Sequence, residues 1–74
     1  MYHVNTKELK KYMIDAGIET NGELSKKSGV NRNTIGEILN NKTYPSSDVM
    51  VRIVTALSIP AEKAGEIFFA RELT

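Results

Sequence analysis

Signals that begin or end helices divide this chain of 74 residues into five short segments, and no other feature constrains its fold as strongly. Apolar residues within the segments follow the spacing of one helix face, and no stretch alternates with the period of a strand. The sequence therefore predicts a single all-α domain of five short helices over residues 1–74. The predicted caps of the first four helices are Asn5, Thr20, Asn31 and Ser46, the predicted first residue of the fifth is Pro60, and the predicted stops are Gly17, Gly29 and Asn40–Asn41.

The apolar faces indicate where the core lies. The second segment contributes Leu24 as its single large apolar residue, so it needs a partner helix to pack on. The most apolar stripe of the chain lies in the fourth segment and is expected at the centre of the core. Its members are Val49, Met50, Ile53, Val54 and Leu57.

The composition excludes several classes of protein. The chain has no cysteine, which rules out a disulfide scaffold, a thiolate zinc site and a cysteine nucleophile. His3 is the single histidine and has no clustered carboxylates near it in sequence, so we expect no metal site and no cofactor. Without a nucleophile–base set or a phosphate loop, we expect no enzyme activity and no small-molecule ligand. The chain lacks an apolar run of membrane-spanning length and a signal-peptide layout, so we expect a cytoplasmic protein with no membrane contact.

The charge is close to neutral and unevenly distributed. The net charge is +1, with seven Lys and Arg against five Asp and Glu in residues 1–44, and three against four in residues 45–74. Within residues 24–44 four basic residues face a single acidic one, a balance of +3. A nucleic-acid-binding domain of this size could be far more basic, so this charge weakens that function without excluding it.

Residues 21–40 carry the pattern that says most about function, because two short helices are joined there by a glycine turn. This is the spacing of a helix-turn-helix unit. Ser25 is small enough for the two helices to cross closely, and Gly29 can take the positive φ of a tight turn at little cost. The residues predicted to point inward and fix the crossing angle are Leu24, Val30, Ile35 and Ile38.

The second helix of this unit, at about residues 32–40, has a stripe made entirely of polar residues and glycine. Its N-terminus would project with Arg32 and Asn33 at the tip. The major groove of DNA, about 12 Å wide, admits one helix, and there Arg pairs with guanine and Asn with adenine. Arg32 also lies where the helix dipole disfavours a positive charge, which favours a functional reason for its position.

The chain resembles the phage-repressor (Cro/Xre-type) helix-turn-helix domains over about residues 9–69. The matching residues run from Leu24 to Ile35 and continue with Ile38, Asn40, Pro45–Ser46 and Ile53–Leu57. The resemblance implies a lambda-repressor-like fold and binding to double-stranded DNA. It implies base contacts from Arg32, Asn33, Gly36 and Glu37, and phosphate contacts from Asn21, Asn40, Lys42 and Thr43.

Three residues depart from the pattern of that family. Ser25 replaces the usual alanine, Ser28 stands where an apolar residue is common, and Asn41 stands where glycine is usual. The turn at residues 19–22 is also one residue longer than is usual. We expect these departures to loosen the fit of the second helix.

Some of the implied contacts have a second interpretation. Gly36 could allow close approach to DNA or close packing between helices. Glu37 could accept a hydrogen bond from cytosine, repel phosphates or remain a solvated charge. Asn40 could cap the end of its helix, bind phosphate or do both.

The last predicted helix contains three consecutive large apolar residues, Ile67, Phe68 and Phe69. They cannot all face one small core, so either the helix is exposed there or it packs on a second subunit. These three residues are the predicted interface of a homodimer. Such a dimer would read two half-sites about one helical turn apart.

The function expected from the sequence is sequence-specific DNA binding by a transcriptional regulator. We expect a small phage-like or mobile-element repressor that binds an operator through the helix at about residues 32–40. The alternative is a protein-interaction module on the same scaffold, such as an antitoxin or a polymerase-binding adaptor.

Overall fold

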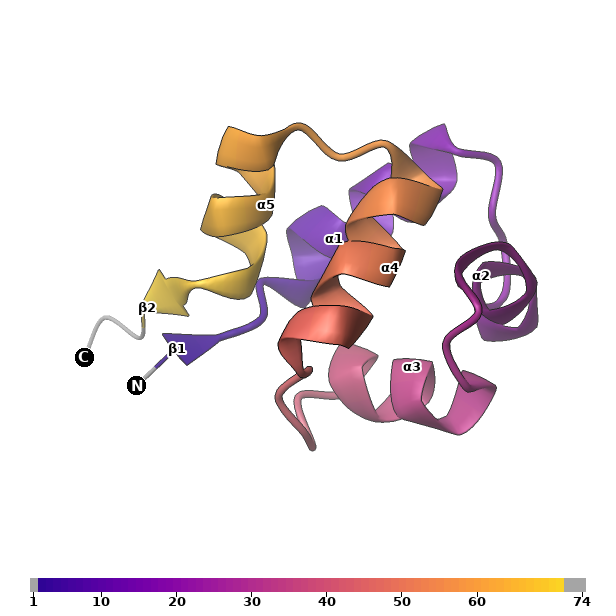
Figure 1. The fold of residues 1–74 in the computed structure, drawn as a ribbon, viewed down its shortest axis with the longest axis horizontal. Helices are drawn as coiled ribbons and strands as arrows, with labels where there is room; N and C mark the ends of the chain where they lie inside the picture. The colour runs from indigo at the N-terminus through magenta and orange to yellow at the C-terminus, as the bar shows by residue number, and fades with distance from the viewer. Residues whose placement is uncertain (1, 72–74) are drawn as a thin grey trace.

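The computed structural model describes residues 2–71, and in that range it contains the five predicted helices (Figure 1). A short antiparallel ribbon joins the two ends of the described chain. The predicted all-α fold is confirmed, since each strand of the ribbon has only two residues. The elements are β1 (Tyr2–His3), α1 (Thr6–Asp15), α2 (Asn21–Ser28), α3 (Arg32–Leu39), α4 (Ser47–Leu57), α5 (Ala61–Phe68) and β2 (Ala70–Arg71).

Polar side chains cap four of the helices at the predicted positions. The Thr20 hydroxyl accepts a hydrogen bond from the N–H of Glu23 at 3.1 Å, and the side-chain oxygen of Asn31 accepts one from the N–H of Asn33 at 2.8 Å. The Glu23 carboxylate in turn accepts the N–H of Glu19 at 3.3 Å, one residue before the Thr20 cap. Each cap satisfies a backbone donor that the helix itself leaves free. The other two caps are Asn5 and Ser46.

The start of the fifth helix differs from the prediction by one residue. Pro60 is the cap and not the first helical residue, because its ψ of 146° is extended and α5 begins at Ala61. The Pro60 carbonyl already accepts the first helical hydrogen bond, from the N–H of Ala64 at 2.8 Å. A proline fits this position because no N–H is needed there.

The predicted helix stops have left-handed backbone conformations. The φ angles are 74° at Gly17, 77° at Gly29 and 54° at Asn41. Two of these positions are glycines, which take this conformation without a steric penalty, and asparagine tolerates it better than most residues. The turns between the first four helices therefore follow from local residue chemistry.

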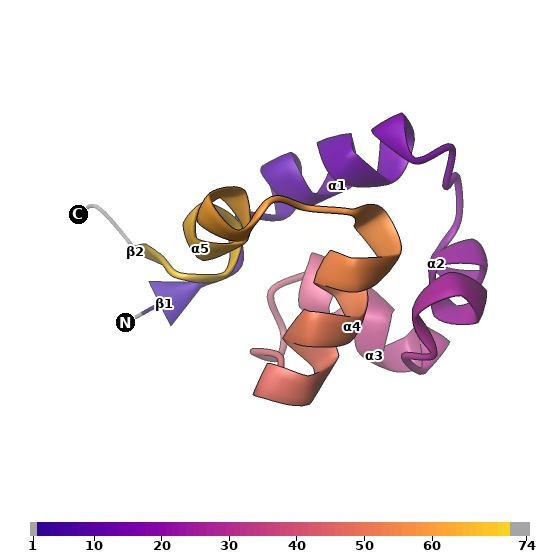
Figure 2. The ribbon, with the colours of Figure 1, turned by 45° about the horizontal axis from the view of Figure 1, so that its top comes forward.

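Apolar side chains from all five helices form one core. In the ribbon, α4 lies in front of α3, with α5 on one side and α2 on the other (Figures 1 and 2). On the predicted α4 stripe, Ile53 and Leu57 are buried, whereas Val49, Met50 and Val54 are only partly buried. The apolar stripe of α4 is thus wider than the part of its surface that the neighbouring helices cover. One edge of α4 remains accessible to solvent.

The terminal ribbon has no counterpart among the predicted elements. Tyr2 pairs with Arg71, and His3 pairs with Ala70. The rings of Tyr2 and Phe69 also pack nearly perpendicular to each other, with the ring centres 5.4 Å apart. Strands of two residues are too short to show an alternating pattern, so the sequence carries no signal for them.

The contacts of Ser28 differ from the expectation that a polar residue at this position loosens the fit of the second helix. Its side chain is buried, its hydroxyl donates to the carbonyl of Leu24 at 2.6 Å, and its oxygen accepts from the N–H of Val30 at 3.1 Å. The hydroxyl therefore satisfies a buried backbone group on each side of the turn. An apolar residue would leave the Val30 N–H without this partner.

Within the described residues, no helix has the length and apolar character needed to cross a membrane. The same part of the chain contains no cluster of three His, Cys, Asp or Glu side chains placed to hold a metal ion.

Replacement of Ser28 by alanine tests the role of this buried hydroxyl. We expect Ser28→Ala to lower the free energy of unfolding by about 1–3 kcal/mol, because a buried N–H loses its acceptor. Ser25→Ala is the matched control, since Ser25 lies in the same helix and makes no side-chain hydrogen bond among the described residues. Denaturant titration of both variants measures the difference. Equal stabilities would contradict the assigned role.

Candidate nucleic-acid interface

The crossing of α2 and α3 forms the candidate site. Gly29 ends α2 in a left-handed conformation, and α3 begins three residues later at Arg32. The four side chains predicted to point inward are all buried, with exposed fractions between 0% and 4%. The two helices therefore meet through apolar contacts on one side and leave their polar residues on the other.

The structure brings most of the predicted contact residues together around one hollow. The hollow has a volume of about 590 Å³ and opens on the outer face of α3. Its lining is polar apart from glycine and consists of Asn21, Arg32, Asn33, Gly36, Glu37, Asn40 and Lys42. Thr43, the remaining predicted contact, follows Lys42 and is exposed.

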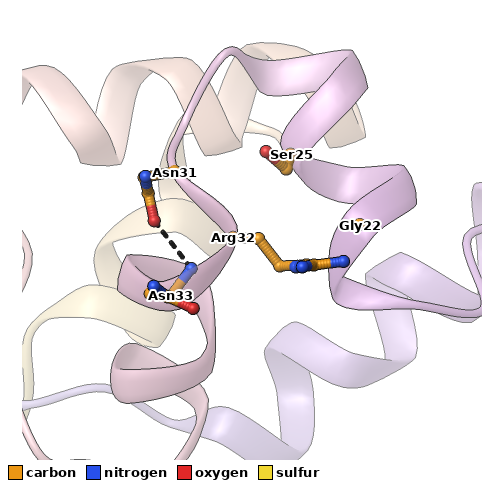
Figure 3. A pocket seen from close by; sticks show the side chains of 5 residues that line it. All are labelled: Gly22, Ser25, Asn31, Arg32 and Asn33. Carbon is orange, nitrogen blue, oxygen red and sulfur yellow. Dashed lines mark hydrogen bonds between the residues drawn. The ribbon is translucent and has the colours of Figure 1, made fainter.

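Arg32 lies between the first turns of the two helices. Its side chain reaches across to Gly22 of α2, where an added Cβ would be 3.7 Å from the Arg32 Cδ atom (Figure 3). Arg32 is exposed, and no carboxylate of the described residues forms an ion pair with it. Its charge is thus available to an anion or to a guanine edge.

Three residues beside Arg32 were not predicted as site residues: Gly22, Ser25 and Asn31, the last of which was predicted only as a helix cap. Gly22 and Ser25 line a second hollow together with Asn31, Arg32 and Asn33 (Figure 3). The sequence signal that could have found Gly22 and Ser25 is the spacing of two small residues at i and i+3 on α2. This spacing leaves room for the Arg32 side chain. Neither residue carries charge, so a search for DNA-contacting side chains passes over them.

Asn21 lies over α3 at Gly36. A Cβ added to Gly36 would be 3.6 Å from the Asn21 amide nitrogen, an ordinary van der Waals distance to the end of a side chain. Packing between α2 and α3 therefore does not require glycine at this position. This observation favours the interpretation that Gly36 allows close approach to DNA over the interpretation that it allows close packing between helices.

The C-terminal end of α3 holds the remaining polar residues. Asn40 occupies the helix C-cap, as its second interpretation predicted, and its side chain also lines the large hollow. Glu37 is exposed and has no ion-pair partner among the described residues. The hollow thus combines two unpaired cations, Arg32 and Lys42, with one unpaired carboxylate.

The three consecutive apolar residues near the C-terminus differ in how far they are buried. Ile67 and Phe68 are each only 1% exposed and belong to the core of the single chain, whereas Phe69 is 50% exposed. The sequence predicted that the three could not share one core, and they do not. Two of the three predicted interface residues therefore offer no free surface in this chain.

A projecting polar helix, held at a glycine turn and carrying unpaired Arg and Asn side chains, defines a DNA-binding domain of the helix-turn-helix class. The chain belongs to the Cro/C1-type helix-turn-helix DNA-binding domain family, whose model matches residues 8–62. No curated protein and no solved structure shows a significant match to the chain. The family match confirms the resemblance inferred from the residues, and it supports the assignment as a DNA-binding regulator.

The surroundings of Gly36 and the backbone conformation of Gly17 lead to opposite predictions for alanine substitution. Gly36→Ala should raise the free energy of unfolding by about 0.5–1 kcal/mol, because it lies inside a helix with room for a methyl group. Gly17→Ala should lower it by about 1–2 kcal/mol, because its φ of 74° strains any residue with a Cβ. Denaturant titration measures both. A destabilised Gly36→Ala variant would show that α2 and α3 need the glycine for packing.

Proposed function

We propose that this protein is a sequence-specific transcriptional regulator, a small repressor of the phage or mobile-element kind that acts in the cytoplasm. It occupies an operator and thereby excludes RNA polymerase. One observation carries this proposal above the others: seven of the eight residues implied to contact DNA line one hollow on α2 and α3. Residues gathered on one surface of a single helix and its neighbours can contact one groove of a DNA duplex together.

In this proposal α3 lies in the major groove and reads base edges. Arg32 pairs with guanine, Asn33 pairs with adenine, and Glu37 accepts from cytosine. Gly36 lets the helix backbone approach the bases, which agrees with the observation that packing against α2 does not require a glycine there. The Arg32 side chain swings from its place beside Gly22 into the groove or reads the base from there.

The flanking residues hold the DNA backbone. Asn21 at the start of α2 and Asn40, Lys42 and Thr43 at the end of α3 contact phosphates on the two sides of the groove. Such contacts fix the register of the protein and carry no sequence information themselves. They account for binding at the low net charge of +1, because few basic residues are needed when polar groups share the phosphates.

We further propose that the protein binds DNA as a homodimer through Phe69. This residue is half-exposed at the end of an apolar hollow of about 350 Å³ between α4 and α5. Val51, which is 63% exposed, lines the same hollow. A symmetric contact there places two α3 helices on half-sites of an inverted repeat.

Selection from random DNA duplexes tests the proposed function. The duplexes that the selection enriches are then titrated with the protein at several salt concentrations. Enrichment of one motif, arranged as an inverted repeat, is the result that the proposal predicts. Binding without enrichment and with a steep salt dependence would show that the protein contacts phosphates and does not read the base sequence. Absence of binding would favour the protein-interaction module, which the near-neutral charge also allows.

Arg32→Ala tests the assignment of a base contact. We expect a loss of about 1–3 kcal/mol in binding free energy and relaxed specificity at one base pair of the selected site. Lys10→Ala, an exposed lysine of α1 without an ion pair among the described residues, is the control and should leave binding unchanged. Equal losses on every duplex would instead assign Arg32 to a phosphate.

A further inference from the structure

The loop between α3 and α4 is fixed firmly at the end of α3. The N–H of Asn41 donates to the carbonyl of Ile38 at 3.0 Å, and the N–H of Lys42 donates to the carbonyl of Glu37 at 2.9 Å. With Asn41 in the left-handed conformation, these two bonds form a Schellman motif. The chain therefore leaves α3 in a defined direction at Lys42.

A second anchor holds the other end of the loop. Pro45 is buried, and the hydroxyl of Tyr44 donates a hydrogen bond to the carbonyl of Phe68, the last residue of α5. That carbonyl belongs to the last turn of a helix, where carbonyls have no partner within the helix. The bond thus joins two segments 24 residues apart and satisfies a backbone acceptor.

Tyr44 is 43% exposed, and its hydroxyl makes the contact with α5. Partial burial, together with the neighbouring Tyr2, raises the pKa of Tyr44 above its ordinary value of 10.0. The hydroxyl therefore keeps its proton, and can donate, at neutral pH and well above it.

We propose that Tyr44 is a positioning residue for DNA binding, which anchors the loop to α5 so that Lys42 and Thr43 face the phosphate backbone. This inference rests on the proposed function and extends it. It assigns α5, which carries none of the proposed DNA contacts, a part in setting the geometry of the phosphate contacts.

The positions of the two residues between the anchors explain why anchoring matters. Lys42 and Thr43 are exposed, and neither side chain makes a hydrogen bond within the described residues. A flexible loop would lose conformational freedom when these residues engage a phosphate, and that loss would weaken binding. A loop held on both sides has already lost that freedom before DNA arrives.

Tyr44→Phe tests the proposal because it keeps the ring and removes only the hydroxyl. The probes are the best duplex from the selection and a mixed-sequence duplex of about 20 base pairs, two turns of DNA. We expect affinity for both duplexes to fall by the same factor, about two- to tenfold, because phosphates are alike in every sequence. Tyr2→Phe is the matched control and should change neither affinity, since the Tyr2 hydroxyl makes no hydrogen bond among the described residues.

A double-mutant cycle separates positioning from a general loss of structure. In a Lys42→Ala, Thr43→Ala background, Tyr44→Phe should cause no further loss of affinity, because the residues through which it acts are gone. An equal loss in both backgrounds, or no loss in the otherwise unchanged chain, would overturn the proposal.

Backbone relaxation measured by NMR on the free protein tests the anchoring by Tyr44 without DNA. Its outcome therefore does not depend on whether the proposed function is right. Tyr44→Phe should increase fast motion at the amides of Lys42 and Thr43, and Tyr2→Phe should not. If the unaltered chain binds neither duplex, the proposed function fails, and this measurement alone decides whether Tyr44 anchors the loop. Unchanged order at both amides would show that it does not.

Discussion

The rest of the structure depends on how α2 packs against α3 across the turn at Gly29. Leu24 is the single large apolar side chain of α2, and it is fully buried. The Ser28 hydroxyl fixes the turn by bonding to backbone groups on both sides of it. Because these contacts set the crossing of the helices, they also decide where Asn21 and Gly22 lie relative to Arg32. The candidate DNA-binding surface is therefore a consequence of a few buried contacts behind it.

The charges of the chain are arranged so that a low net charge still leaves free cations at this surface. Three ion pairs among the described residues neutralise charges away from the hollow, between Lys11 and Glu8, Arg52 and Asp48, and Lys63 and Glu66. Arg32 and Lys42 are outside these pairs. Against the single carboxylate of Glu37, these two cations give α3 and its loop a local charge of +1, equal to the net charge of the whole chain.

Sequence reasoning succeeded where the signal was local. Caps such as Thr20 and stops such as Gly29 act on neighbouring backbone groups, and the polar stripe of α3 follows from helical spacing, so the helices and most of the hollow could be predicted. Contacts between distant segments could not. The terminal ribbon has two-residue strands, and the Tyr44 bond reaches across 24 residues to α5. Ser28 was misjudged because its hydroxyl is satisfied by backbone groups that a family pattern of apolar residues does not reveal.

The central claim is that the outer face of α2 and α3 is the surface that meets DNA. Titration of the isotope-labelled protein with a DNA duplex, followed by backbone NMR shifts, tests this most directly. The account predicts that the largest shift changes fall on Asn21, on residues 32–37 and on residues 40–43. Changes concentrated on the apolar hollow between α4 and α5, with α3 unaffected, would contradict it.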